Sequence, residues 1–94
     1  MTKEQEMFWK EMRYIQDEIT VLYSMRTQKY DCVEQLLEDV IYETIYAMME
    51  LFDGLKNKCF RGDIIYLPSG ESINTIHDTL HDDCPDHLKY WNVI

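Results

Sequence analysis

The chain has 94 residues, of which 18 are acidic and nine are basic, and its formal net charge is −9 at pH 7. This length suits one domain with its own core and leaves no room for a separate cofactor domain. The acidity argues against direct nucleic-acid binding, because phosphates are bound by clustered cations. No apolar run approaches the length that crosses a bilayer, and the first residues lack the order of a signal peptide. We therefore expect a cytoplasmic protein without a membrane partner.

Two long amphipathic patterns predict a mainly α-helical fold, a single helical domain over residues 1–94 in which two long helices and one or two short ones form a small bundle. Glycine and proline are scarce, which also favours helix over a turn-rich sandwich. The first pattern repeats apolar residues at alternating steps of four and three: Phe8, Met12, Ile15, Ile19 and Leu22. It predicts a helix from about Lys3 to Gln28.

The second pattern is a wide apolar stripe on a strongly acidic helix. Asp31 can cap this helix, which should end near Asp53-Gly54. Apolar residues outside the stripe, Tyr42, Tyr46 and Met49, need cover from the C-terminal residues or from another chain, so a homodimer is one expectation. The region from Tyr30 to Leu55 contains no Lys or Arg, and its acids should form a negative face: Asp31, Glu34, Glu38, Asp39, Glu43, Glu50 and Asp53.

The chain after the second helix carries weaker signals. Near residues 58–68 we expect a short irregular or β-like segment, in which "DIIYLP" is either a short strand or one helical turn ended by Pro68. Ser72 can then cap a third helix with Ile73, Ile76 and Leu80 on its apolar face. Pro85 either stops that helix or opens a short last one.

All the histidines and one cysteine lie in "HDTLHDDCPDH". His77 and His81 are one helical turn apart, and Cys84 or His87 can add a third ligand of the kind that zinc prefers. On the same helical wheel, however, His77 and Cys84 fall beside the apolar residues of that helix, so a place in the core is the favoured interpretation. We therefore expect no metal and no other cofactor, and a metal-binding or metal-sensing protein is an alternative.

Catalytic motifs are missing from the sequence. It has no phosphate-cradling glycine loop, no G-x-S-x-G elbow and no C-x-x-C pair. Cys84 and His81 could act as a nucleophile and its base, but the neighbouring aspartates disfavour a thiolate. We therefore predict that the protein is not an enzyme.

The stretch "DIIYLP", followed by "SGESINTI", resembles the "D-[LI]-I-Y-x-P" segment of colicin-type nuclease immunity proteins. The matching residues are Asp63, Ile65, Tyr66 and Pro68, whereas Leu67 stands where that family has a second contact tyrosine. Members of the family are small acidic helical domains that block a toxic nuclease through this segment and the acidic helix before it. The resemblance implies that Asp63 and Tyr66 are contact residues and that the acidic second helix sets partner choice. The chain also resembles short uncharacterised bacterial proteins, which implies no function.

Charge and resemblance together predict an immunity-type inhibitor or antidote of a basic enzyme such as a nuclease, acting by acidic and aromatic contacts. The expected contact residues are Glu34, Glu38, Asp39, Asp63, Tyr66 and Glu71. One alternative is a phage or mobile-element inhibitor that mimics nucleic-acid charge to block a host defence enzyme. Another is the metal-binding helical protein that uses His77, His81 and Cys84. For Tyr66 itself, the alternative role is to close the end of the helical core.

Overall fold

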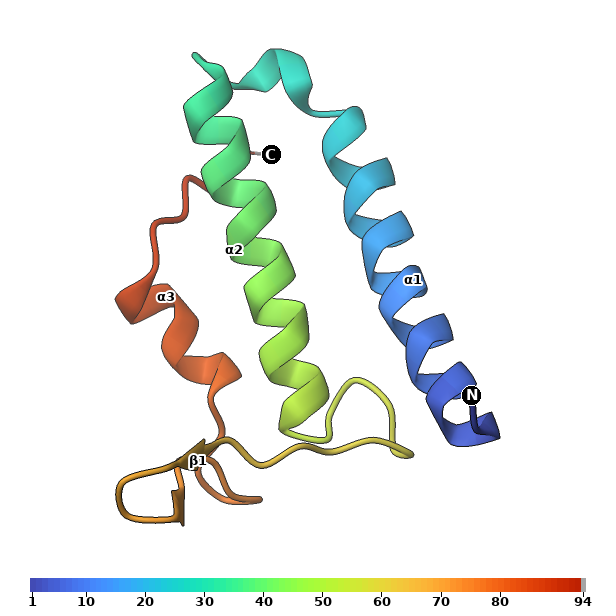
Figure 1. The fold of residues 1–94 in the computed structure, drawn as a ribbon. Coiled ribbons are helices and arrows are strands. Elements are labelled where there is room, and N and C mark those ends of the chain that lie inside the picture. Colours follow the sequence, from blue (N-terminus) through green and yellow to red (C-terminus); the bar gives the residue numbers. More distant parts are fainter. Residues whose placement is uncertain (94) are drawn as a thin grey trace. The chain divides into compact units, whose positions relative to one another are not determined.

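The computed structural model describes residues 1–93 and is mainly helical, with two long helices, a short helical segment and a two-stranded hairpin (Figure 1). The fold class is therefore the one that the sequence predicts. The chain divides into two compact units: Met1–Thr44 together with the chain from Lys89 onward, and Ile45–Leu88. Helix α2 is continuous across this boundary, and the single domain over residues 1–94 stays a prediction. No helix among the described residues is both long enough and apolar enough to cross a bilayer.

Helix α1 (Lys3–Ser24) begins at a capping box. The hydroxyl of Thr2 accepts a hydrogen bond from the backbone N–H of Gln5, and the Gln5 side chain accepts one from the Thr2 N–H, so two otherwise unpaired donors are satisfied. The helix buries Ile15 and Tyr23. It ends four residues before the predicted Gln28, because the chain tightens there into the short 3₁₀ helix η1 (Thr27–Lys29).

Helix α2 (Val33–Phe52) ends where the sequence predicts. Gly54 follows it with φ of 79°, a left-handed conformation that glycine adopts without strain. The backbone N–H of Gly54 donates to the carbonyl of Leu51, and that of Leu55 donates to the carbonyl of Glu50. These bonds satisfy carbonyls that the end of a helix leaves unpaired.

The first unit places the C-terminal residues on α2. The ring of Tyr90 stacks on that of Tyr42, with their centroids 3.9 Å apart and 9° between their planes. Tyr42 is buried as a result. The C-terminal residues thus provide the cover that the sequence requires for Tyr42, and the homodimer stays a prediction.

The second unit contains an antiparallel hairpin of β1 (Ile65–Tyr66) and β2 (Glu71–Ser72), in the register Ile65↔Ser72 and Tyr66↔Glu71. The strand interpretation of "DIIYLP" is therefore correct. Gly70, with φ of 74°, closes the turn by donating its N–H to the carbonyl of Tyr66 at 2.7 Å.

The predicted third helix from Ile73 is wrong. Ser72 lies in β2, residues 73–80 form no regular element, and the helical segment is only η2 (His81–Asp83) followed by α3 (Cys84–His87). The reason is local, because Ser72 donates its hydroxyl to the carbonyl of Asn74, and Thr75 accepts from the N–H groups of His77 and Asp78. Such side-chain bonds give the backbone an alternative to helix. Pro85 lies in the first turn of α3, so the alternative in which this proline opens a short last helix is the correct one.

Candidate functional site

The hairpin segment, residues 63–71, contains the predicted contact residues Asp63, Tyr66 and Glu71. The pairing of β1 with β2 places Tyr66 opposite Glu71. Tyr66 is 59% exposed and the neighbouring Leu67 is 86% exposed, so neither closes the end of a core. Asp63 is also exposed and pairs with Arg61, whose Nη2 lies 3.1 Å from its Oδ1. The segment thus presents an aromatic and an aliphatic side chain to solvent beside carboxylates.

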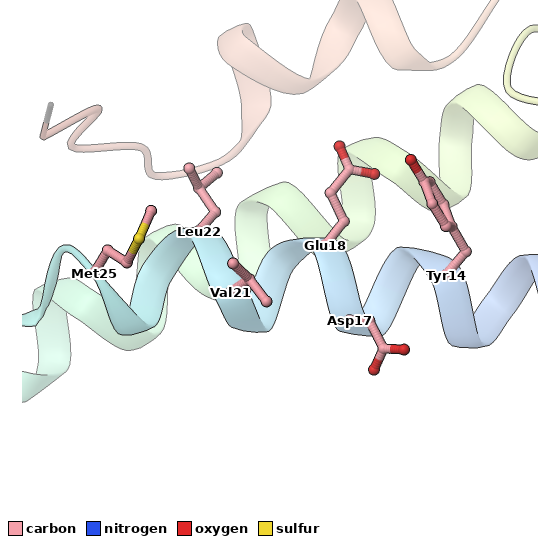
Figure 2. A pocket seen from close by; sticks show the side chains of 6 residues that line it. All are labelled: Tyr14, Asp17, Glu18, Val21, Leu22 and Met25. Atoms are coloured by element: carbon pink, nitrogen blue, oxygen red, sulfur yellow. The ribbon is translucent and has the colours of Figure 1, made fainter.

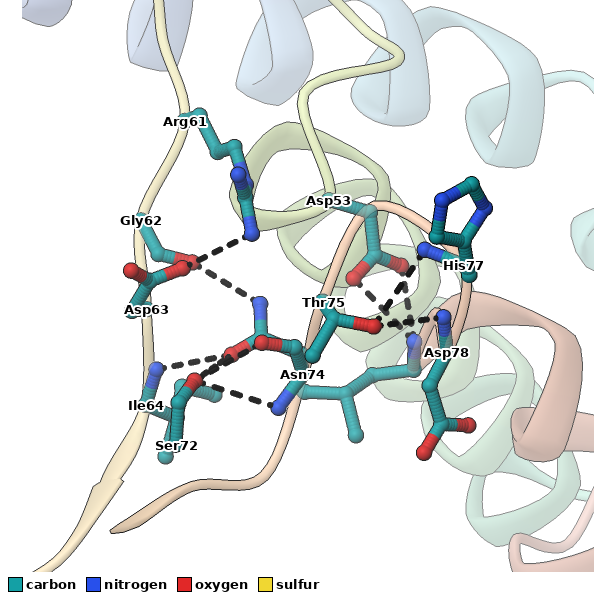
Figure 3. Close-up of polar contacts among 11 residues, drawn as sticks. Asp53, Arg61, Gly62, Asp63, Ile64, Ser72, Asn74, Thr75, His77 and Asp78 are labelled. Atoms are coloured by element: carbon teal, nitrogen blue, oxygen red, sulfur yellow. Dashed lines mark hydrogen bonds and ion pairs between the residues drawn. The ribbon is translucent and has the colours of Figure 1, made fainter. Parts of the chain in front are cut away.

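The base of the hairpin segment is fixed by the buried amide of Asn74 (Figure 3). Its Oδ1 accepts from the N–H of Ile64 and its Nδ2 donates to the carbonyl of Gly62, both at 2.8 Å. Gly62 must be small, because a Cβ at this position would lie 2.8 Å from a ring carbon of Phe52. The backbone that leads into β1 is therefore held in place.

A second polar centre in this unit is the carboxylate of Asp53, at the end of α2 (Figure 3). This side chain is fully buried. It accepts from the backbone N–H groups of Leu80 and His81 at 2.9 Å each, and the His81 Nδ1 lies 2.9 Å from its Oδ2. Burial alone would raise the pKa of Asp53, but the bonds from His81 and Leu80 outweigh it and lower the pKa below its usual value. The carboxylate of Asp53 thus acts as an anchor that fixes the backbone at the start of η2.

The residues of the metal alternative have other roles in this structure. His81 contacts Asp53 through Nδ1 and Asp82 through Nε2, the latter at 3.2 Å, whereas His77 is exposed. Cys84 is buried, and burial, followed by the charges of Asp83 and Asp53, raises the pKa of its thiol. Within residues 1–93 no three histidine, cysteine or acidic side chains come together as metal ligands would.

The purified protein should carry no stoichiometric zinc, and a chelator should leave its melting temperature unchanged, because the described residues bring no three potential ligands together through which a metal could stabilise the fold. Metal analysis of the purified protein, with melts in the presence and absence of the chelator, checks this. His77→Ala changes an exposed histidine and should melt as the wild type does. One bound zinc per chain, lost together with thermal stability in His77→Ala, would restore the metal interpretation.

The acids predicted on α2 lie in the first unit and differ in exposure. Glu34 is exposed, whereas Glu38 is mostly buried and pairs with Lys89 at 3.6 Å. Asp39 is fully buried. Its two oxygens accept from the hydroxyl of Tyr30 at 2.7 Å and from the N–H of Trp91 at 2.6 Å. Asp39 is therefore an internal anchor for the C-terminal residues and not a surface contact.

Sequence reasoning did not predict the polar contacts that organise each unit internally. Tyr90 donates its hydroxyl to Glu43 at 2.6 Å, and Asp53 and Asn74 organise the second unit. The pairing of Tyr90 with α2 has one sequence signal, the apolar surface of Tyr42 that requires cover. No local pattern marks Asn74. Comparisons with known protein families, curated proteins and solved structures find no match to this chain.

Proposed function

We propose that the chain is a binding protein that inhibits a basic enzyme, such as a nuclease, through its hairpin segment. The supporting observation is the exposed pair Tyr66 and Leu67 on a backbone that the buried Asn74 holds in place. A rigid aromatic side chain at the surface is the usual anchor of a protein interface, because it buries a large area and loses little conformational entropy.

Charge supports a basic partner for this interface. The net charge of −9 attracts a cationic protein before contact, and Glu71 beside Tyr66 offers a carboxylate to a Lys or Arg of that protein. The same carboxylates can occupy positions that phosphates take in a nucleic-acid-binding enzyme. Inhibition then follows from blocking that surface, with no chemical step by this chain.

Tyr66→Ala should weaken binding to the partner by at least about 2 kcal/mol, the scale of an interface hot spot. Stability should change by less than about 1 kcal/mol, because the side chain is exposed and removing it leaves no cavity. The partner is first isolated from the native host with the wild-type chain, and its affinity for wild type and variant is then measured by calorimetry. Inhibition of the partner's enzymatic activity is assayed alongside.

The matched control is Trp9→Ala, which removes a similarly exposed aromatic side chain from α1 in the other unit. This variant should bind the partner as the wild type does. Equal losses in Tyr66→Ala and Trp9→Ala would reject the hairpin segment as the contact. So would a steep fall in the melting temperature of Tyr66→Ala in the absence of partner, since that result would make Tyr66 a core residue.

A further inference from the structure

A shallow groove of about 440 Å³ runs along α1 in the first unit (Figure 2), with a mostly apolar lining: Tyr14, Asp17, Glu18, Val21, Leu22 and Met25. Arg13, whose Nε lies 3.0 Å from the carboxylate of Asp17, precedes these residues in the sequence, and Arg26 follows them. The two cations balance the charges of Asp17 and Glu18, so the groove favours neither a basic nor an acidic partner. The second unit contains a side-chain cluster whose geometry is more specific.

This cluster centres on the imidazole ring of His81, which lies between two carboxylates. Its Nδ1 is 2.9 Å from Oδ2 of Asp53, and its Nε2 is 3.2 Å from Oδ1 of Asp82. The side chain of His81 is only 12% exposed, and the ring of Tyr46 packs edge-on against it with the centroids 5.7 Å apart. The imidazole is therefore held in an orientation in which each of its nitrogens faces an acceptor.

The two contacts of the ring together require two protons. A neutral imidazole has one N–H donor, whereas an imidazolium donates from both nitrogens, and an ionised carboxylate can only accept. Although burial alone would raise it, the pKa of Asp53 lies below its usual value, so this carboxylate is charged at neutral pH. Both contacts are therefore hydrogen bonds only when His81 carries a proton on each nitrogen.

The two carboxylates differ in their freedom to move. Asp53 is fully buried and also accepts from the backbone N–H groups of Leu80 and His81, so it stays in place. Asp82 is 72% exposed, and its Oδ2 accepts from the hydroxyl of Thr79 at 2.9 Å. A single proton on the ring belongs on Nδ1, because the buried charge of Asp53 would otherwise face a lone pair. The lone pair of Nε2 then faces Asp82, which can turn toward solvent.

Titratable groups approach the ring from three elements. Helix α2 and the residue that follows it contribute Tyr46 and Asp53, η2 contributes Asp82, and α3 begins at Cys84, whose backbone N–H donates to the carbonyl of His81. Burial, followed by the charges of Asp83 and Asp53, raises the pKa of the Cys84 thiol, which therefore stays uncharged between about pH 5 and 8. The sequence contains no Lys or Arg from residue 64 to residue 88.

We propose that His81 is a pH-sensitive clasp, in which a proton on Nε2 joins the ring to Asp82 and loss of that proton to solvent opens this contact. The Nδ1–H bond to Asp53 stays closed in both states. The clasp responds between about pH 5 and 8, because that is the range in which histidine changes its charge. It goes beyond the proposed inhibitory function, since it requires neither a partner nor the hairpin segment.

The first test is nitrogen NMR of the histidine rings in the full chain, with the signals of His81 assigned by their loss in His81→Gln. At about pH 5.5 both ring nitrogens of His81 should carry a proton, and at about pH 8 only Nδ1 should carry one. His77 and His87 are exposed and serve as internal controls whose rings are not fixed in the Nδ1–H form. A neutral His81 with its proton on Nε2 at the higher pH would overturn the proposal.

The second test compares two aspartates that differ in their contact with the ring. Asp82→Ala removes the carboxylate that faces Nε2, whereas Asp86→Ala removes an exposed carboxylate from α3. Chemical denaturation measures the folding equilibrium constant of each variant relative to the wild type. The loss in Asp82→Ala should be at least about threefold greater at pH 5.5 than at pH 8, because a pair with one exposed partner contributes modestly and only while His81 is charged.

The loss in Asp86→Ala should be nearly the same at the two pH values. Equal losses at both pH values in Asp82→Ala would overturn the proposal. So would an equal pH dependence in Asp86→Ala, because that result would mean a general effect of removing negative charge. Tyr66→Ala should leave the ring signals of His81 unchanged, so failure of the hairpin proposal and failure of this one are distinguishable.

Discussion

Asp53→Ala should lower the free energy of unfolding by about 3 kcal/mol or more, because each buried donor that loses its acceptor costs about 1–3 kcal/mol. The substitution removes the carboxylate that accepts from the backbone N–H groups of Leu80 and His81, and it leaves the Nδ1 of His81 facing a void. Chemical denaturation of wild type and variant measures the difference. It should be the largest effect of any single acidic residue in the second unit.

Asp63→Ala is the matched control, because Asp63 is an exposed aspartate paired with the exposed Arg61. Surface ion pairs contribute little, so this variant should lose less than about 1 kcal/mol. If Asp53→Ala lost no more than this control, the carboxylate of Asp53 would not be the anchor of η2.

The pH dependence of stability provides a second measurement of the contribution of Asp53. The pKa of Asp53 is lower in the folded chain than in the unfolded chain. Its contribution to stability is therefore present above the pKa of the unfolded chain and is lost as the pH falls through the folded pKa. The gap in stability between wild type and Asp53→Ala should therefore narrow below about pH 4. A gap that stays constant down to the lowest pH would mean that the charge of Asp53 contributes nothing.

Asp39→Ala should lower the free energy of unfolding by about 3 kcal/mol, since hydrogen bonds to a charged group contribute more than neutral ones and two such bonds would be lost. The donors are the hydroxyl of Tyr30 and the N–H of Trp91. Asp31→Ala, at an exposed aspartate just before α2, should lose less than about 1 kcal/mol. Denaturation of the two variants under identical conditions gives the comparison.

The phenol of Tyr30 reports on Asp39 independently of stability. Burial, together with the hydrogen bond to the Asp39 carboxylate, raises the pKa of Tyr30 well above its usual value. In Asp39→Ala this phenol should ionise closer to an ordinary tyrosine, which an alkaline absorbance titration detects. An unchanged titration in a folded variant would show that Asp39 does not hold Tyr30.

The long helices could be predicted because their signals are local. The apolar stripes of α1 and α2 and the glycine after Phe52 lie within the elements that they define. The helix expected from Ile73 failed because its apolar spacing competes with Ser72 and Thr75, whose side chains bond to the backbone of residues two or three positions further along. The periodicity of apolar residues takes no account of hydrogen bonds between side chains and the backbone.

The acids show why the candidate site could be predicted only in part. In the sequence, Asp39 and Asp53 look like members of the same negative face as Glu34. The structure buries both, because their donors come from far along the chain: Trp91 lies 52 residues from Asp39, and Leu80 lies 27 residues from Asp53. Tyr66 lies in the stretch "DIIYLP", which the sequence leaves open between a strand and a helical turn, and its position opposite Glu71 depends on pairing with β2.

The long reach of the C-terminal residues also affects how the native state forms and decays. Tyr30 and Asp39 are only nine residues apart, whereas Asp39 and Trp91 are separated by 52. Closing the short loop costs less chain entropy, so we expect Tyr30 to reach Asp39 before residues 89–93 dock. Interactions made after the folding barrier has been crossed slow unfolding and leave the rate of folding nearly unchanged. We therefore expect Tyr90 and Trp91 to lengthen the lifetime of the folded protein more than they change the rate of folding.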